Sequence, residues 1–337
     1  MLSETTVECL YHERAILLRR PFQMPAHGTP SGCSVKIVVE GTEIPYPDSV
    51  IRAKLRLGGL SGSQLESVME KIRRKHAKGV GVVDEDTLTL ELLELAEMTK
   101  RSANHDRLNL VMMYYEARRS SQGLPPVIVV LEGASATGKS MMALELIEDL
   151  AATRILTTDT VRQALREVYS EKTHPELYCH TYQAHTKRQS GPTDLLPVVR
   201  GFIAQTELIQ PKVVDSVARI SREGTDAVVE GVHLIPGSMA SLGSNVVEVV
   251  VDPPPAVHRA MFIAKSVMSG LTTVSTDLNV RSREFDDTRL IQDYLVNTAK
   301  ALDIPVVPLV EYSDALSTIR GLVLGYMKRA LETREHK

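Results

Sequence analysis

The residues from Gly133 to Ser140 are spaced as a loop that binds phosphate groups. The string Gly-Ala-Ser-Ala-Thr-Gly-Lys-Ser fits the pattern G-x-x-x-x-G-K-[ST] at every fixed position. Its glycines let successive backbone N–H groups face an anion, and the helix that follows adds its positive N-terminal end. Lys139 can then reach the β- and γ-phosphates, and the Ser140 hydroxyl can ligate Mg²⁺, so we predict a site for ATP with Mg²⁺. The residues predicted to contact the nucleotide are Gly133, Ala134, Ser135, Ala136, Thr137, Gly138, Lys139, Ser140 and Met141.

Two carboxylates follow strand-like stretches further along the chain. Asp159 closes the stretch Ile155–Asp159 and opens a helix, where it could be an N-cap, a residue that orients an acceptor hydroxyl in line with the γ-phosphate, or both. Glu230 ends the stretch 226–230, at the place where phosphate-loop enzymes carry the acid that positions Mg²⁺ and its waters. We predict that Lys139, Asp159 and Glu230 are catalytic.

Cationic side chains near these acids could bind an anionic acceptor. Arg162 and Arg166 are four residues apart and share a helix face, and His233 lies three residues after Glu230. Solvated arginines and a structural histidine are the alternative.

Two further arginines follow a polar stretch rich in serine and threonine, residues 270–277. A mobile lid that carries arginines would neutralise the charge that spreads during phosphoryl transfer. We therefore predict that Arg281 or Arg283 acts catalytically, without choosing between the two; a plain basic surface loop is the alternative.

The elements that must position these residues alternate between strands and helices. The pattern predicts strands at 127–131, 154–157, 226–230, 246–251 and 304–309. Helical spacing is predicted at 139–150, 160–169, 176–222, 255–269, 284–302 and 313–333. This alternation is typical of an α/β fold with a parallel sheet and helices on both faces, and ligands of such folds gather beyond the carboxyl ends of the strands. We assign residues 127–337 to this phosphate-loop kinase-type domain.

The chain before the phosphate loop is predicted to form a smaller, mainly helical domain. Residues 1–34 are predicted to be an extension and linker, and residues 120–126 a second linker. Between them, residues 35–119 are predicted to form two short strands followed by helices near 48–57, 62–78 and 86–119, the last broken near 102–106. This segment has a strand, an acidic-Gly turn, a second strand and then a helix that carries Arg52, Lys54 and Arg56. In this arrangement it resembles the ATP-cone domain. That resemblance implies a small nucleotide-binding regulatory module.

Composition excludes several classes of protein. The net charge is −3, aromatic residues are 4% of the 337 residues, and Trp is absent, which disfavours a nucleic-acid partner. The three cysteines are far apart, which favours a reducing cytosol and predicts neither a zinc site nor a disulfide framework. No apolar stretch is long enough for a membrane span. We expect a cytoplasmic protein whose partner is a small phosphorylated molecule, with a homo-oligomer left open.

Several segments together resemble archaeal-type 2-phosphoglycerate kinase. They are Gly133–Ser140 with its strand, Thr157–Arg162, Gly201–Val217, the string EGVHLIPG from Glu230 to Gly237, and Arg289–Leu295 leading to Ile304-Pro-Val. The resemblance implies ATP-dependent phosphorylation of the 3-hydroxyl of 2-phosphoglycerate, which gives 2,3-bisphosphoglycerate and ADP. An acceptor with a phosphate and a carboxylate would explain why Arg162, Arg166 and His233 cluster near Asp159.

Other functions are compatible with the same motifs. The chain could be a kinase for another phosphorylated polyol or for a nucleoside, or a regulatory ATP-binding protein that has lost catalysis. The intact Lys139, Ser140, Asp159 and Glu230 disfavour the regulatory protein. A polynucleotide kinase would need a basic channel, which the slight acidity of the chain disfavours.

Overall fold

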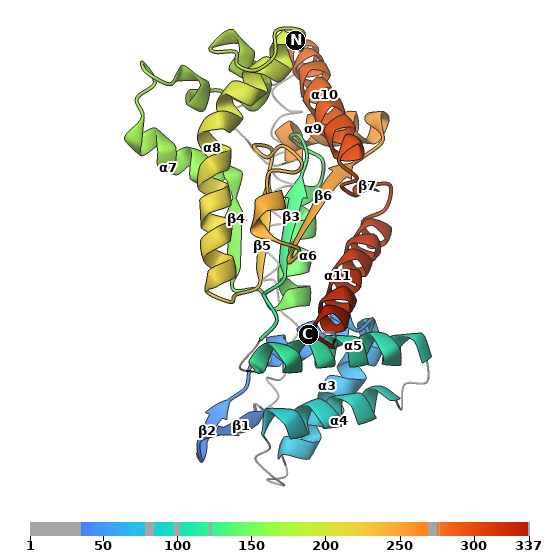
Figure 1. Cartoon of the computed structure of the whole chain (residues 1–337). Helices are drawn as coiled ribbons and strands as arrows, with labels where there is room; N and C mark the ends of the chain where they lie inside the picture. The colour runs from blue at the N-terminus through green and yellow to red at the C-terminus, as the bar shows by residue number, and fades with distance from the viewer. Residues whose placement is uncertain are drawn as a thin grey trace, which may run out of the picture.

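The computed structural model describes residues 35–77, 84–97, 102–120, 123–268, 275 and 277–335. A region built on a parallel sheet lies above a smaller helical region (Figure 1). The predicted extension, residues 1–34, lies outside the described residues. Among the described residues, no helix combines the length and the apolarity that crossing a bilayer requires.

The sheet confirms the predicted fold class. Within the described residues its strands are β3 (Ile128–Glu132), β4 (Arg154–Thr157), β5 (Ala227–Gly231), β6 (Val246–Asp252) and β7 (Val306–Pro308). They are all parallel and lie in the order β4-β5-β3-β6-β7. The strand that precedes the phosphate loop is therefore central, with a partner on each side.

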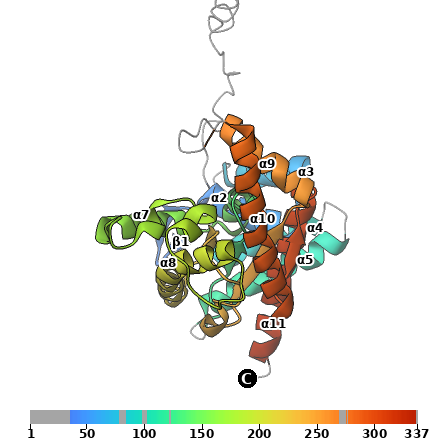
Figure 2. The same cartoon turned by 90° about the horizontal axis from the view of Figure 1, so that it is seen from above.

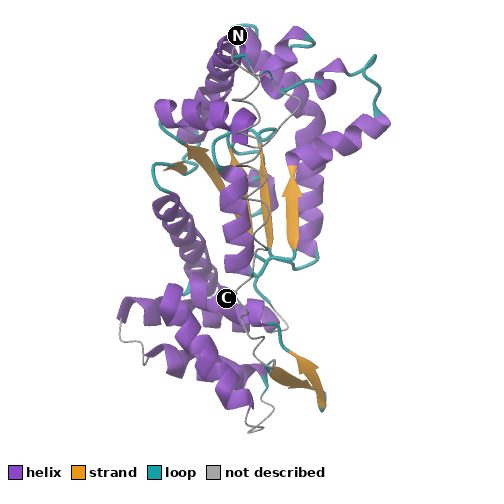
Figure 3. Cartoon of the chain, turned by 180° about the vertical axis from the view of Figure 1, so that it is seen from behind, coloured by secondary structure: helices purple, strands orange, loops and turns teal. Residues whose placement is uncertain are grey.

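Helices cover both faces of the sheet because side chains alternate along each strand. Val129 and Leu131 of β3 pack in one apolar cluster with α6 (Lys139–Leu150) and α11 (Tyr312–Glu335). Ile128 and Val130 point the other way, toward α8 (Pro197–Arg222). Figures 2 and 3 show these helices from above and from behind. The remaining helices of this region are α7 (Thr158–Val168), α9 (Pro255–Met268) and α10 (Leu278–Ala301).

Two helical predictions are wrong in extent. The stretch 176–222 is not one helix: short 3₁₀ helices at Pro175–Tyr178 and Thr181–Thr186 precede a loop, and α8 begins only at Pro197. Proline disfavours the α conformation in the residue before it but is tolerated in the first turn of a helix. Pro197 is therefore the first residue of α8. Helix α10 begins before the predicted residue 284, because the Asp277 side chain caps it by accepting a hydrogen bond from the backbone N of Asn279 at 2.8 Å.

The helical region has its own apolar cluster. Strands β1 (Lys36–Val39) and β2 (Thr42–Pro45) pair antiparallel, and helices α2 (Asp48–Leu57), α3 (Gly62–Ala77), α4 (Glu85–Glu97) and α5 (Ser102–Arg119) follow. Helix α4 ends and α5 begins close to the predicted break. Buried side chains such as Ile51, Leu88 and Leu108 form the core of this region.

A partly buried ion pair joins the two regions below the sheet. Arg118 of α5 donates hydrogen bonds of 2.7 Å to both carboxylate oxygens of Asp226, which comes just before β5. The same carboxylate accepts a 2.7 Å bond from the backbone N of Val127, just before β3. The pair therefore fixes α5 to the amino ends of the two central strands, opposite the phosphate loop.

Candidate nucleotide and acceptor site

The loop between β3 and α6 has the bent backbone that the motif predicts. Gly133 and Gly138 have positive φ angles of 146° and 86°, and Ala136 between them has 64°. A Cβ atom on Gly138 would lie 2.5 Å from Leu309 Cδ2, so only glycine fits at the start of α6. The loop thus stands at the carboxyl end of the central strand and runs directly into a helix N-terminus, which is a favourable place for an anion.

Lys139 lies folded against the loop that it follows. Its side-chain amine donates to the carbonyl oxygen of Ala134 at 2.8 Å and contacts the Thr137 hydroxyl at 3.2 Å, and the residue is only 6% exposed. Ser140 and Met141, in the first turn of α6, are exposed. The charged amine is therefore already held at the loop, where a phosphate chain would meet it.

Two buried side chains brace the phosphate loop from outside the motif. Gln292 of α10 accepts a 2.8 Å hydrogen bond from the backbone N of Ala134 and donates to Val251 O and the Asp252 carboxylate at 3.0 and 3.1 Å. His258 of α9 contacts the carbonyl oxygen of Ser135 at 2.8 Å through Nε2. Burial lowers the pKa of His258, so the ring is neutral and its Nε2–H donates.

Sequence reasoning missed both of these bracing residues. The only signal for Gln292 was its place within the Arg289–Leu295 string, and no local pattern marked His258.

A buried acid lies at the end of β3, directly before the loop. Glu132 is fully buried, and burial raises its pKa well above the usual value, with the negative charge of Glu248 on β6 adding to the effect. A neutral carboxyl here avoids placing a negative charge under the site predicted for a triphosphate.

Strand register brings Asp159 and Glu230 to the same edge as the loop. Glu230 pairs with Leu131 of β3 on one side and with Thr157 of β4 on the other. Asp159 follows two residues after Thr157, in the first turn of α7, and the Thr157 hydroxyl caps that helix by accepting from the backbone N of Thr160. Asp159 is therefore not the side-chain cap, and its side chain is exposed at the helix start.

The close approach of α7 to β5 depends on Gly231. A Cβ atom at this position would lie 2.0 Å from the Thr158 hydroxyl oxygen, which no side chain could tolerate. The absence of a side chain at Gly231 therefore accommodates Thr158, the first residue of α7. This packing holds Asp159 beside the carboxyl end of β5.

The two predicted acceptor arginines engage the loop that precedes α8. Arg162 pairs with Asp159 at 2.9 Å and donates to the carbonyl oxygen of Cys179. Arg166 donates to the carbonyl oxygen of Leu177 at 2.7 Å. Both guanidinium groups therefore bind backbone carbonyls of the segment that connects α7 to α8.

The structure places His233 in the interior of the protein. It is fully buried; Nδ1 is 2.9 Å from the Thr158 hydroxyl, and Nε2 is 2.8 Å from Gln205 Oε1. Burial lowers its pKa to about 3, and the charge of Arg162 adds to the shift, so the imidazole is neutral. His233 thus connects the end of β5 to the first residue of α7, and its contact with an acceptor stays a prediction.

The two predicted lid arginines have different surroundings. Most of the predicted lid, residues 270–274 and 276, lies outside the described residues. Arg281 is 2% exposed, lies 3.9 Å from the Phe262 ring centroid and pairs with Glu284 at 2.8 Å, so it anchors α10 to α9. The guanidinium is thus buried and paired in this structure, and the catalytic role of Arg281 stays a prediction. Arg283 is exposed on the same helix, and its role stays a prediction.

The donor set fits a metal ion that arrives with the nucleotide. Among the described residues, no group of three or more His, Cys, Asp and Glu side chains could hold a metal ion by itself. The Ser140 hydroxyl and the carboxylates of Asp159 and Glu230 are hard oxygen donors at one sheet edge. Mg²⁺ commonly keeps several waters and uses phosphate oxygens with few protein ligands, so this sparse set is compatible with it.

Comparison with known proteins points to one enzyme family. No family model matches the chain. A 2-phosphoglycerate kinase of Methanopyrus kandleri is 28% identical over 79% of this chain and 79% of that protein. The enzymes of the same name from Thermococcus kodakarensis and Methanocaldococcus jannaschii are 26% and 25% identical, and the matches cover 86% and 88% of this chain and 94% of each relative.

Solved structures of small-molecule kinases also align with the sheet region. Shikimate kinase from Acinetobacter baumannii in complex with shikimate aligns with a TM-score of 0.38 and 11% identity over 63% of this chain and 97% of its own. A gluconokinase from Sinorhizobium meliloti aligns with a TM-score of 0.33 and 14% identity over 63% of this chain and 97% of its own. Over most of its length the chain is thus similar to the archaeal 2-phosphoglycerate kinases, as its motifs indicated.

Proposed function

We propose that the protein is an ATP-dependent kinase that phosphorylates 2-phosphoglycerate on its 3-hydroxyl. The observation that carries the proposal is the phosphate loop, whose bent backbone and inward-folded Lys139 form a site at the central strand. The acceptor is chosen from the names of the relatives, which are 2-phosphoglycerate kinases over most of this chain.

In the proposed reaction, the acceptor hydroxyl attacks the γ-phosphorus of ATP in line with the bridging oxygen. A new oxygen–phosphorus bond forms, the bond to the β,γ-bridging oxygen breaks, and ADP leaves with that electron pair. Asp159 orients the hydroxyl and accepts its proton on a carboxylate oxygen. The loop amides and Lys139 hold the β- and γ-phosphates and meet the charge that develops on them.

Mg²⁺ would be held by the Ser140 hydroxyl and nucleotide oxygens, with Glu230 positioning its waters. When bound, it supplies charge neutralisation of the transferred phosphoryl group. Met141 lies in the first turn of α6, the helix whose positive end would face the phosphates.

The acceptor is proposed to lie between α7 and the loop before α8. Arg162 and Arg166 are both cationic there, and an acceptor carboxylate or phosphate would compete with Asp159 for Arg162. A closed state would exclude water, and Arg283 is the exposed arginine of α10 that could then approach the transferred group. The ATP-cone resemblance of residues 35–119 stays a prediction, and we assign these residues an accessory role.

The experiment that tests the function is an ADP-release assay with purified protein, ATP and Mg²⁺. 2-Phosphoglycerate, 3-phosphoglycerate and glycerate are compared as acceptors, and ³¹P NMR identifies the product. We expect 2-phosphoglycerate to give the highest kcat/KM and 2,3-bisphosphoglycerate to accumulate. Equal or greater turnover with 3-phosphoglycerate or glycerate would overturn the acceptor assignment. ATP binding without turnover on any acceptor would indicate the regulatory protein instead.

A further inference from the structure

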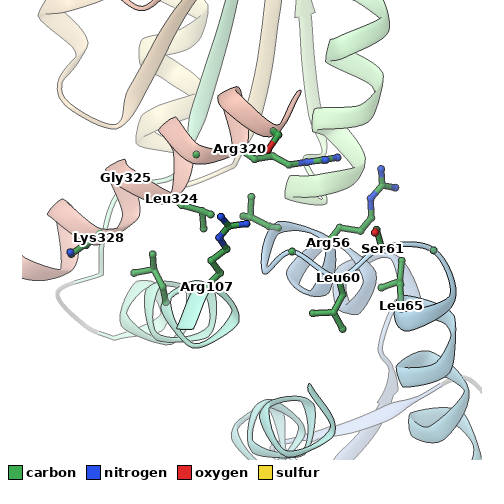
Figure 4. A pocket seen from close by; sticks show the side chains of 15 residues that line it. Arg56, Leu60, Ser61, Leu65, Arg107, Arg320, Leu324, Gly325 and Lys328 are labelled. Atoms are coloured by element: carbon green, nitrogen blue, oxygen red, sulfur yellow. The ribbon is translucent and has the colours of Figure 1, made fainter. Parts of the chain in front are cut away.

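A cavity of about 680 Å³ lies between the helical region and the last helix of the sheet region (Figure 4). Its walls come from the end of α2, the start of α3, one face of α5 and the middle of α11, and we call it the α2–α11 pocket. Part of the wall is apolar and is formed by leucines, among them Leu60, Leu65 and Leu324. The pocket lies at the C-terminal end of α6, about 15 Å along that helix from Lys139. It is therefore separate from the phosphate loop.

The charged residues that line this pocket are all cationic. They are Arg56, Arg107, Arg320 and Lys328. Two of them bind a carboxylate of α6: Asp149 lies 2.9 Å from Arg56 Nε and 2.6 Å from Arg320 Nε.

The other two cations remain available to a ligand. Arg107 is exposed, extends from α5 into the space beneath α11 (Figure 4), and forms no ion pair within the described part of the chain. Lys328 is 69% exposed and has only a loose contact of 3.9 Å with Glu332. The pocket thus presents two positive charges that the protein itself does not neutralise.

Glycines keep the α11 wall of the pocket open. Gly321 and Gly325 are four residues apart in α11 and both line the pocket. Glycine destabilises the interior of a helix, and it is commonly found there where another part of the protein packs closely against the backbone. A Cβ atom on Gly321 would meet no heavy atom within 4 Å, so packing within the described chain does not explain it. The space that it leaves belongs to the pocket.

The start of α3 adds a third anion-binding element to this wall. Ser61 and Gly62 line the pocket where the helix begins, and the first N–H groups of a helix favour a negative charge. Cations, a helix N-terminus and a leucine wall thus surround one cavity. We propose that the α2–α11 pocket binds a small molecule that carries at least two negative charges on phosphate groups and has a compact organic body.

A ligand in this pocket would bridge the two regions of the protein. Arg56 belongs to α2 and Arg320 to α11, and both hold Asp149 of the helix that begins at the phosphate loop. Binding would therefore strengthen contacts between α2, α6 and α11. We expect it to raise the melting temperature of the full chain as well as to occupy a second site.

The test measures binding in a variant with a weakened phosphate loop. Isothermal titration of Lys139→Ala with inorganic pyrophosphate, ADP or 2,3-bisphosphoglycerate isolates the pocket, and the three probes distinguish a bare phosphate chain, a nucleotide and a phosphorylated acid. We expect one binding site per chain for at least one probe, weakened by added salt. Adding Arg107→Glu should weaken binding about tenfold or more, because an attraction becomes a repulsion.

A second variant tests whether the space in the pocket is needed for binding, independently of the charge of its lining. Gly321→Leu fills the open space without removing a cation, and the empty surroundings of its Cβ position mean that α11 should fold normally, which circular dichroism checks. We expect it to abolish binding of the same probe in the Lys139→Ala background. Lys212→Glu, a charge reversal at an exposed position of α8 outside the pocket, is the matched control and should leave binding unchanged. Binding of no probe to Lys139→Ala, or binding unaffected by Arg107→Glu and Gly321→Leu, would overturn the proposal.

Discussion

The phosphate loop and the acceptor side of the site lie at the same sheet edge but are built differently. In the loop, the predicted features are local: bent backbone, helix start and Lys139 all follow within eight residues. On the acceptor side, Arg162 and His233 have partners far along the chain, namely the Cys179 carbonyl and the Gln205 amide. A residue type therefore predicts chemistry well where its partners are its neighbours in sequence, and poorly where distant elements decide its partners.

Among the variants of the phosphate loop, Lys139→Ala should have the largest effect on activity. Removing the amine that meets the β- and γ-phosphates should lower kcat/KM for 2-phosphoglycerate by about 10³-fold or more. The fold should persist, because the side-chain amine bonds within its own loop, to the Ala134 carbonyl and the Thr137 hydroxyl. Steady-state kinetics with a melting curve measures both effects. Activity within a few fold of the wild type would remove the phosphate loop from the mechanism.

On the acceptor side, Asp159→Asn should have the next largest effect. The amide keeps the shape of the side chain but cannot accept the hydroxyl proton, so kcat should fall by about 10²-fold. Because Asp159 is exposed and is not the side-chain cap of α7, the unfolding free energy should hardly change. Stopped-flow measurement of the chemical step, compared with Asp314→Asn at an exposed position in the first turn of α11, distinguishes catalysis from a general charge effect. An equal loss in both variants would contradict the assignment.

Gln292→Leu tests whether the phosphate loop depends on a side chain from the distant helix α10. The variant leaves the backbone N–H of Ala134 without its buried acceptor, which should destabilise the protein by about 1–3 kcal/mol. A loosened loop should also raise KM for ATP roughly tenfold while kcat changes less.

Kinetics at several ATP concentrations and urea unfolding measure the two effects of Gln292→Leu. Thr298→Val, which removes a hydroxyl that bonds within the same helix, is the control. A loss of stability with an unchanged KM for ATP would make Gln292 a purely structural residue.

His233→Gln should have a smaller effect that depends on pH. Burial lowers the pKa of His233 from its usual 6.5 to about 3 in the native protein, so below neutral pH the unfolded chain binds a proton that the native protein does not. The contribution of His233 to stability is therefore present above about pH 6.5 and declines as the pH falls toward 3. The stability gap between wild type and His233→Gln should be largest near pH 7 and narrow by about pH 5 in urea unfolding. A gap that widens on acidification would mean that the histidine is charged in the native state.

The smallest expected effect on activity is that of Glu132→Gln. The amide resembles the neutral carboxyl that burial enforces, so kcat/KM should stay close to the wild-type value. The native pKa of Glu132 is raised, so the wild type holds a proton that the unfolded chain releases, and its stability declines as the pH rises above the unfolded pKa. Urea unfolding between about pH 5 and pH 8 should show that the variant loses less stability than the wild type. A strong loss of activity would instead indicate that Glu132 is ionised and interacts with the nucleotide.

The wrong helix boundaries follow the same division between local and distant contacts. The periodicity of apolar residues located the sheet strands to within a residue or two, because each strand has an apolar pattern within its own short stretch of sequence. It failed across 176–222, where contacts between residues far apart within that stretch, such as Gln205 donating to the Glu176 carbonyl, determine the structure. It also placed Arg281 on a lid, whereas capping by Asp277 draws that residue into a buried position of α10.

By itself, the sequence determined the phosphate loop, the parallel sheet and the edge at which Asp159 and Glu230 meet. Backbone bending and the alternation of strands and helices depend on glycine placement and on patterns that a short window contains. Only the tertiary structure decided that Gln292 and His258 brace the loop, that His233 and Arg281 are buried, and that cations from three helices line one cavity. Those outcomes depend on which distant side chains exclude water from one another, and burial then determines which groups keep their charge.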